Sequence, residues 1–174
     1  MRWNPDAYGP EIAAILALDG NGERLMSLAE PRCVSEDARA RIALAPVPET
    51  LRAGLYLYFG CWADAHETAQ AIDTREGSYW HAIVHRQEPD AGNAGYWFGQ
   101  VGTHPIYAQL AQLANEPTLT PWNPRKFIEY CERARREPGS ELERRAQELQ
   151  RLEWQLLFDY CAKGRRSQES GVRS

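Results

Sequence analysis

The sequence has few cysteines, no long apolar run and no N-terminal stretch typical of a signal peptide. It contains four cysteines among 174 residues, and no two of them form a C-x-x-C pair. In a reducing compartment this spacing predicts small buried thiols rather than disulfides or a zinc–thiolate site. No apolar run approaches the roughly eighteen residues of a membrane helix, so we expect no membrane association. The N-terminal stretch contains acids and prolines where a signal peptide would be basic and then apolar, which favours a cytoplasmic protein.

A strong charge of either sign is also absent. The formal net charge is −4. Basic residues become frequent after residue 123, but they alternate with glutamates, as in ERARREPGSELERRAQELQR. Such mixing is typical of helix faces with salt bridges rather than of a surface that follows phosphates. We therefore expect no nucleic-acid partner.

Strand patterns are nearly absent, whereas helix start signals recur along the chain. The side chains that we expect to cap helices are Ser35, Ser78, Asp90, Asn123 and Ser140. Ser140 also begins a capping box for a long final helix, which Gly164 would end. The sequence predicts an all-α single domain over residues 1–164, made of about seven or eight short antiparallel-packed helices with a long C-terminal helix. Residues 165–174 would form a flexible tail.

The four histidines are confined to one stretch of the chain, between residues 66 and 104. His81 and His85 stand four apart on a predicted helix over 79–88, so their rings lie one above the other. His66 belongs to the preceding predicted helix, over 62–72, which a short loop should fold back alongside. Two imidazoles at this spacing can share a metal ion, and His66 would supply a third ligand. Glu88 or Asp90 would complete the set, although the proline after Glu88 leaves its direction open.

The same stretch also fits an anion site without metal. Arg86, His81 and His85 lie near predicted helix N-termini and would hold a carboxylate or phosphate between aromatic walls. One histidine would then act as general acid or base, because the pKa of imidazole lies near neutrality. Further ligand-binding candidates in and around the stretch are Tyr79, Asp90, Asn93, His104 and Gln70.

A purely structural interpretation competes with both hypotheses. Buried histidines commonly bond to carbonyl or carboxylate groups, and Asp90 suits a helix cap at least as well as a ligand position. Ser78 also suits a cap better than a nucleophile. The aromatic residues of the stretch would form core, and His104, which precedes a proline, would shape a helix entry.

Residues 77–105, GSYWHAIVHRQEPDAGNAGYWFGQVGTHP, resemble the signature of an uncharacterised family of bacterial and fungal proteins. The resemblance implies that the polar residues of the stretch act together, namely His81, His85, Arg86, Glu88, Asp90, Asn93 and His104. It carries no activity. Gly95 and Gly99 stand where bulkier or charged residues are expected in the family signature. This puts in doubt a functional role for the outer face of the helix predicted over residues 91–101. A shift of 29 residues also aligns DAHETAQAI with NAGYWFGQV, a weak likeness to tetratricopeptide-like helical hairpins.

These observations lead to one hypothesis and one alternative. The protein would carry a histidine-lined polar pocket that binds a small anionic molecule or a divalent metal. If the pocket is catalytic, His81, His85, Arg86 and Glu88 would do the chemistry, with His66 as a further metal ligand. The alternative is a non-enzymatic helical-hairpin module that binds another protein, and a homodimer fits either hypothesis. Convergence of the imidazole nitrogens on a cavity would favour the site, whereas rings that point apart and have backbone partners would favour the module.

Overall fold

The computed structural model describes the backbone of residues 3–29 and 31–171 and the side chains as far as residue 164. Within these residues the chain forms nine α-helices, three short 3-10 helices and no strand, which confirms the all-α prediction. The helices are α1 Pro10–Leu16, α2 Glu36–Leu44, α3 Glu49–Tyr58, α4 Trp62–Gln70, α5 Arg75–Gln87, α6 Ala91–Val101, α7 Ile106–Ala114, α8 Pro124–Arg135 and α9 Glu141–Gly171. None of the described helices has an apolar stretch long enough to cross a bilayer.

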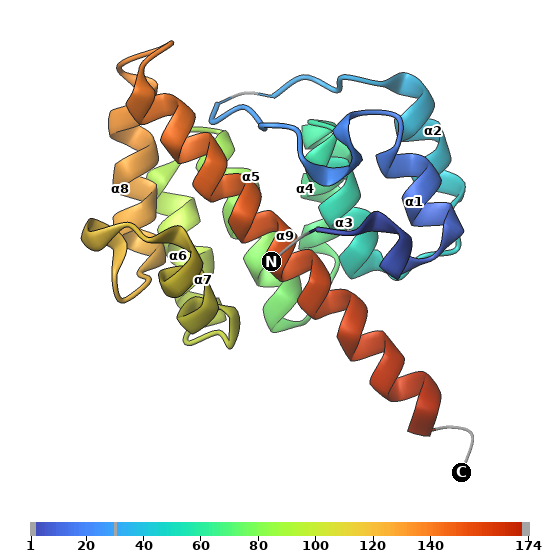
Figure 1. Cartoon of the computed structure of the whole chain (residues 1–174). Helices are drawn as coiled ribbons and strands as arrows, with labels where there is room; N and C mark the ends of the chain where they lie inside the picture. Colours follow the sequence, from blue (N-terminus) through green and yellow to red (C-terminus); the bar gives the residue numbers. More distant parts are fainter. Residues whose placement is uncertain (1–2, 30, 172–174) are drawn as a thin grey trace.

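The long helix α9 organises the packing (Figure 1). It runs between the N-terminal helices and the α6–α8 group, and it contacts α3, α7 and α8. Gly54 of α3 makes the crossing close, because a Cβ there would lie 3.0 Å from both Trp80 and Phe158. The Trp154 indole donates a hydrogen bond to the Gly54 carbonyl over 2.7 Å. Aromatic side chains of α5 and α9 therefore meet against the backbone of α3 in one core.

Most predicted helix starts are confirmed by hydrogen bonds from the expected caps. Ser35 accepts from Ala38 N over 3.1 Å. Asp90 accepts from the Asn93 amide over 2.9 Å. The corresponding caps of α8 and α9 are Asn123 and Ser140. These bonds span two or three residues, so the local sequence suffices to predict them.

The predicted start of α5 and the predicted end of α9 are wrong. Helix α5 begins at Arg75, and Thr74 rather than Ser78 is its cap, accepting from Gly77 N over 3.2 Å. Gly77 permits this earlier start, because a Cβ there would lie 2.2 Å from the Ile72 carbonyl oxygen. Helix α9 passes Gly164 and continues to Gly171. The predicted flexibility of residues 165–174 stays a prediction, and residues 172–174 lie outside the described part.

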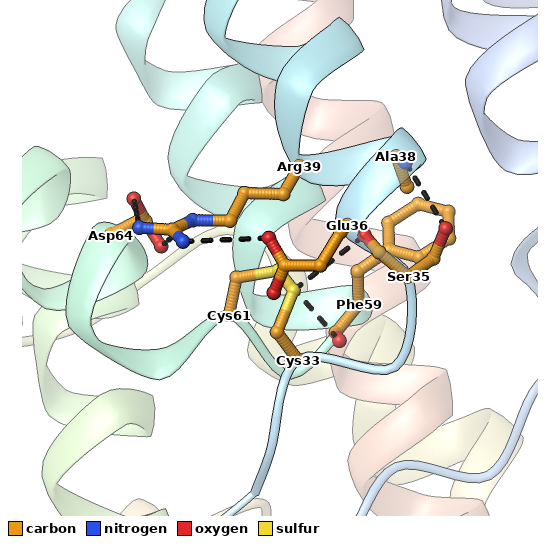
Figure 2. A network of polar contacts seen from close by, with 8 residues as sticks. All are labelled: Cys33, Ser35, Glu36, Ala38, Arg39, Phe59, Cys61 and Asp64. Carbon is orange, nitrogen blue, oxygen red and sulfur yellow. Dashed lines mark hydrogen bonds and ion pairs between the residues drawn. A yellow bond between two sulfur atoms is a disulfide. The ribbon is translucent and has the colours of Figure 1, made fainter.

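The prediction that no cysteine forms a disulfide is also wrong. Cys33 and Cys61 are bonded, and their Cα atoms are 4.1 Å apart (Figure 2). The bond joins the segment before α2 to the residue before α4. Nearby, Arg39 forms a two-pronged ion pair with Asp64 of α4, with N–O distances of 2.9 and 3.1 Å. The two cysteines are 28 residues apart, and the backbone bond from Val34 N to the Phe59 carbonyl, 2.9 Å long, helps to hold their segments together. Cys131 and Cys161 are free thiols, as expected.

Candidate functional site

Helices α4 and α5 bring three of the four histidines together. The helices are joined by residues 71–74 and pack against each other. His66 lies on α4, while His81 and His85 lie one turn apart on α5. The Nε2 atom of His81 is 3.1 Å from Nε2 of His66 and 3.1 Å from Nε2 of His85. The imidazole nitrogens therefore converge on one another, and the predicted pocket beside them stays a prediction.

The geometry of this group, the histidine triad of His66, His81 and His85, resembles that of a metal ligand set. One nitrogen atom from each ring lies within 4.8 Å of the others. Zinc–imidazole bonds of 2.0–2.1 Å at the tetrahedral angle separate two ligand nitrogens by about 3.3 Å. The observed 3.1 Å separations are close to that value.

Burial lowers the pKa of two members of the triad, His81 and His66. His81 is 2 % exposed and His85 is 8 % exposed, whereas His66 is partly exposed. Burial, followed by the nearby His85 and His66, lowers the pKa of His81 to about 4. Burial, followed by His85, also lowers the pKa of His66. Neutral imidazole is the form that binds metal, so little proton loss accompanies binding at His81 near pH 7.

Glu88 contacts the triad from outside. Its carboxylate oxygen lies 2.9 Å from Nδ1 of His85, the ring nitrogen that does not face His81. A carboxylate accepts the Nδ1 proton, so neutral His85 directs the lone pair of Nε2 toward the other two rings. Glu88 therefore orients a triad imidazole and is not itself a member of the triad. Sequence alone left its direction open because of the proline that follows.

Two tryptophans cover the triad, whereas the sequence predicts only core or generic walls for the aromatic side chains of residues 77–105. The Trp62 ring stacks on His66 with centroids 5.2 Å apart, and its indole N–H donates to the Val84 carbonyl over 3.1 Å. The Trp97 ring of α6 lies 4.2 Å from that of His81. Trp62 stands four residues before His66, a spacing that predicts contact on one helix face. No local signal links Trp97 to His81.

Asp90 and Asn93 pair with each other beside the triad. Asp90 caps α6, and the Asn93 side-chain amide donates to its second carboxylate oxygen over 2.7 Å. The Asn93 hydrogen bonds lower the pKa of Asp90. Asp90 also forms a compact group with His85 and Glu88, in which one ligand atom of each lies within 4.8 Å of the others. The capping role predicted for Asp90 is present, and its carboxylate lies near the outer side of His85.

Arg86 and Tyr79 lie in the core and contact α9 instead of the triad. The Arg86 guanidinium forms a fully buried ion pair with Glu153 over 2.6 Å. It also lies over the Phe127 ring, 4.5 Å from the centroid. The Tyr79 hydroxyl donates to the other Glu153 oxygen over 3.0 Å. Arg86 and Tyr79 therefore bind Glu153 in the core and do not join the histidines, contrary to the prediction from the sequence.

His104 and Gln70 also lie outside the triad. His104 is buried, its Nε2 lies 3.7 Å from a Glu76 oxygen, and its ring packs edge-on against Tyr79. Burial lowers the pKa of His104. His104 Nδ1 accepts from Ile106 N at the start of α7, as a helix-entry residue would. Gln70 is exposed at the end of α4.

A hollow of about 520 Å³ lies away from the triad, between α6, α7 and the start of α8. Its lining includes Phe98, Tyr107, Trp122 and Arg125 and none of the histidines. No family model, curated protein or solved structure matches the chain.

Proposed function

We propose that the protein binds one divalent transition-metal ion through the Nε2 atoms of the histidine triad, and that Zn²⁺ is the best match. The observation that carries the proposal is the convergence of three imidazole nitrogens, with two Nε2–Nε2 distances of 3.1 Å. Zn²⁺ is commonly held by three histidines with one further position. Mg²⁺ and Ca²⁺ prefer oxygen ligands, so they suit this set of donors poorly.

The protonation of the three rings supports a metal over a network of hydrogen bonds. With its Nδ1 proton directed at Glu88, neutral His85 presents a lone pair at Nε2. His81 Nε2 faces both neighbours, yet a neutral ring nitrogen either donates one proton or accepts. If it accepts, its lone pair faces the lone pair of His85 Nε2 over 3.1 Å, and the two repel unless a cation lies between them. A metal ion between the rings satisfies all three lone pairs at once.

The competing hypotheses receive less support. An anion site needs a cation that faces the ligand, and the only arginine of residues 77–105 is the buried partner of Glu153. Imidazoles that converge, as these do, favour a site over a protein-binding module. We assign no reaction to the site. A small-molecule ligand, a homodimer and the absence of a nucleic-acid partner stay predictions.

The predicted cytoplasmic location stays a prediction as well. Disulfides persist mainly in oxidising compartments, so the bond between Cys33 and Cys61 favours such a compartment over a reducing cytosol. Thiol labelling in denaturant directly after cell lysis, which also exposes the buried Cys131, decides between the two. Labelling of all four cysteines would favour the cytoplasm, and labelling of two would favour the oxidising compartment.

The proposed metal site is tested by zinc binding to the purified protein after chelator treatment. Equilibrium dialysis followed by metal analysis should find one zinc per chain. His66→Ala should weaken binding by more than about 100-fold, the upper end of what an outer-shell partner contributes. The matched control is Gln70→Ala, which removes an exposed side chain one turn further along the same helix and should leave affinity unchanged.

Two results would contradict the proposal. One is a wild-type protein that binds no zinc while circular dichroism shows it to be folded. The other is equal zinc affinity in His66→Ala, His81→Ala and Gln70→Ala, which would place the metal elsewhere.

A further inference from the structure

We propose that the metal in the histidine triad keeps one coordination position open to solvent, and that a small exogenous anion such as a carboxylate binds there. This inference rests on the proposed metal site. It goes further by assigning the triad to the class of metal centre that takes up a ligand, instead of the closed class that only stabilises a fold.

The number of protein donors supports an open position. Structural zinc sites use four protein ligands, whereas sites that bind water or substrate use three. Across residues 3–29 and 31–164, no further His, Cys, Asp or Glu joins the group of His66, His81 and His85. Glu88 is the nearest carboxylate, and it occupies Nδ1 of His85, on the other side of the ring from the metal-facing nitrogen.

Differences in burial indicate the side from which a ligand enters. His81 and His85 lie in the interior, whereas His66 is partly exposed on the shorter helix α4. We therefore infer that a ligand reaches the three nitrogens past His66. Trp62 stacks on His66 and Trp97 packs against His81, and these two partly buried rings flank this approach. Tyr96, 58 % exposed, packs edge-on against Trp97 and extends the aromatic border outward.

The charges nearby make anion binding depend on the metal. Arg86 is buried against Glu153, and the acidic Glu88 and Asp90 lie beside His85. Metal-free protein therefore offers an anion neutral imidazoles next to carboxylates, which do not attract it. A bound divalent ion supplies the missing positive charge and a vacant orbital. Anion binding should appear only after the metal has bound.

The experiment uses Co²⁺ in place of Zn²⁺, because the visible absorption of cobalt reports its coordination. The chelator-treated full chain is loaded with Co²⁺ in chloride-free buffer and titrated with azide, then separately with acetate. We expect a saturable change in the cobalt bands with one azide per cobalt, and acetate should compete with azide. Gln70→Ala should behave as the wild type. Metal-free protein should bind no azide by calorimetry.

The outcomes separate the two proposals. If cobalt binds and neither anion alters its spectrum, the position is closed and this inference is overturned while the metal site stands. If the folded chain binds no cobalt, both fail. Azide binding of equal strength with and without cobalt would also overturn the inference, because the anion would then bind to protein groups.

Discussion

Zinc should raise the thermal stability of this protein by an amount that can be calculated. A ligand that binds only the folded state at a free concentration of 100 times its Kd adds about 2.7 kcal/mol. For a domain of 150–250 residues, each kcal/mol shifts Tm by about 2–4 °C. We therefore expect zinc to raise Tm by about 5–11 °C under these conditions, measured by calorimetry or by circular dichroism.

The pH dependence of this shift follows from the pKa of His81. At pH 5.5 an imidazole with the ordinary pKa of 6.5 is about 9 % neutral, so three of them would weaken metal binding roughly 1000-fold. The pKa of His81 is lowered to about 4, so this ring stays almost wholly neutral at that pH. The loss of zinc affinity between pH 7.5 and 5.5 should therefore be at least about tenfold smaller than for three ordinary imidazoles.

Variants show whether the triad is responsible. His66→Ala should abolish the zinc-induced rise in Tm, and Gln70→Ala should retain it. His66 is partly exposed, so its truncation should leave the metal-free protein folded. A rise in Tm that is the same in both variants would refute the reasoning. The reasoning would also be refuted if zinc affinity fell between pH 7.5 and 5.5 as steeply as it would for three ordinary imidazoles. Buried His81 would then not stay neutral at pH 5.5.

Four further outcomes test other parts of the structure. Glu88→Gln should weaken zinc binding about 10- to 100-fold in equilibrium dialysis without unfolding the protein, because it removes the carboxylate on His85 Nδ1; unchanged affinity would deny Glu88 an orienting role. Glu153→Gln leaves the buried Arg86 guanidinium without its ion pair and should cost about 3–5 kcal/mol in urea unfolding, whereas zinc stoichiometry should stay at one per chain. The pKa of His104 is lower in the folded state than in the unfolded chain. Above about pH 6.5 neither state binds the proton, whereas below that pH the unfolded chain takes it up more readily, so the unfolding free energy falls. In metal-free His104→Asn the unfolding free energy should therefore fall less between pH 7 and pH 5 than in the wild type. Reduction of the disulfide, which closes a loop of 28 residues, should lower the unfolding free energy by about 3–4 kcal/mol, and equal urea midpoints with and without reductant would contradict this.

The position of Arg86 shows how a motif can mislead about a site. It follows His85 directly, so the sequence places it in the same polar cluster. Successive residues on an α-helix point about 100° apart, however, whereas residues seven apart share a face. Arg86 therefore shares a face with Tyr79, and both reach Glu153 of α9. The neighbours in the sequence belong to two different environments.

The contact of Trp97 with His81 shows a second limit of sequence analysis. Helical periodicity places Trp97 on the apolar face of α6, where core packing is the ordinary expectation. Which ring it meets depends on how α6 crosses α5, and that crossing is set by all the side chains between them. The same holds for Glu88, whose direction depends on the turn between these two helices.

The sequence by itself determined most of the helices and the adjacent imidazoles of His81 and His85, because both depend on interactions within about four residues. Caps such as Ser35 and Asn123 bond to amides two or three residues away, and His81 and His85 are one turn apart. The tertiary structure alone decided the disulfide and the partner of Arg86, and it brought His66 to the pair. These contacts join residues 15 to 67 positions apart, and the packing of whole helices fixes which of them form.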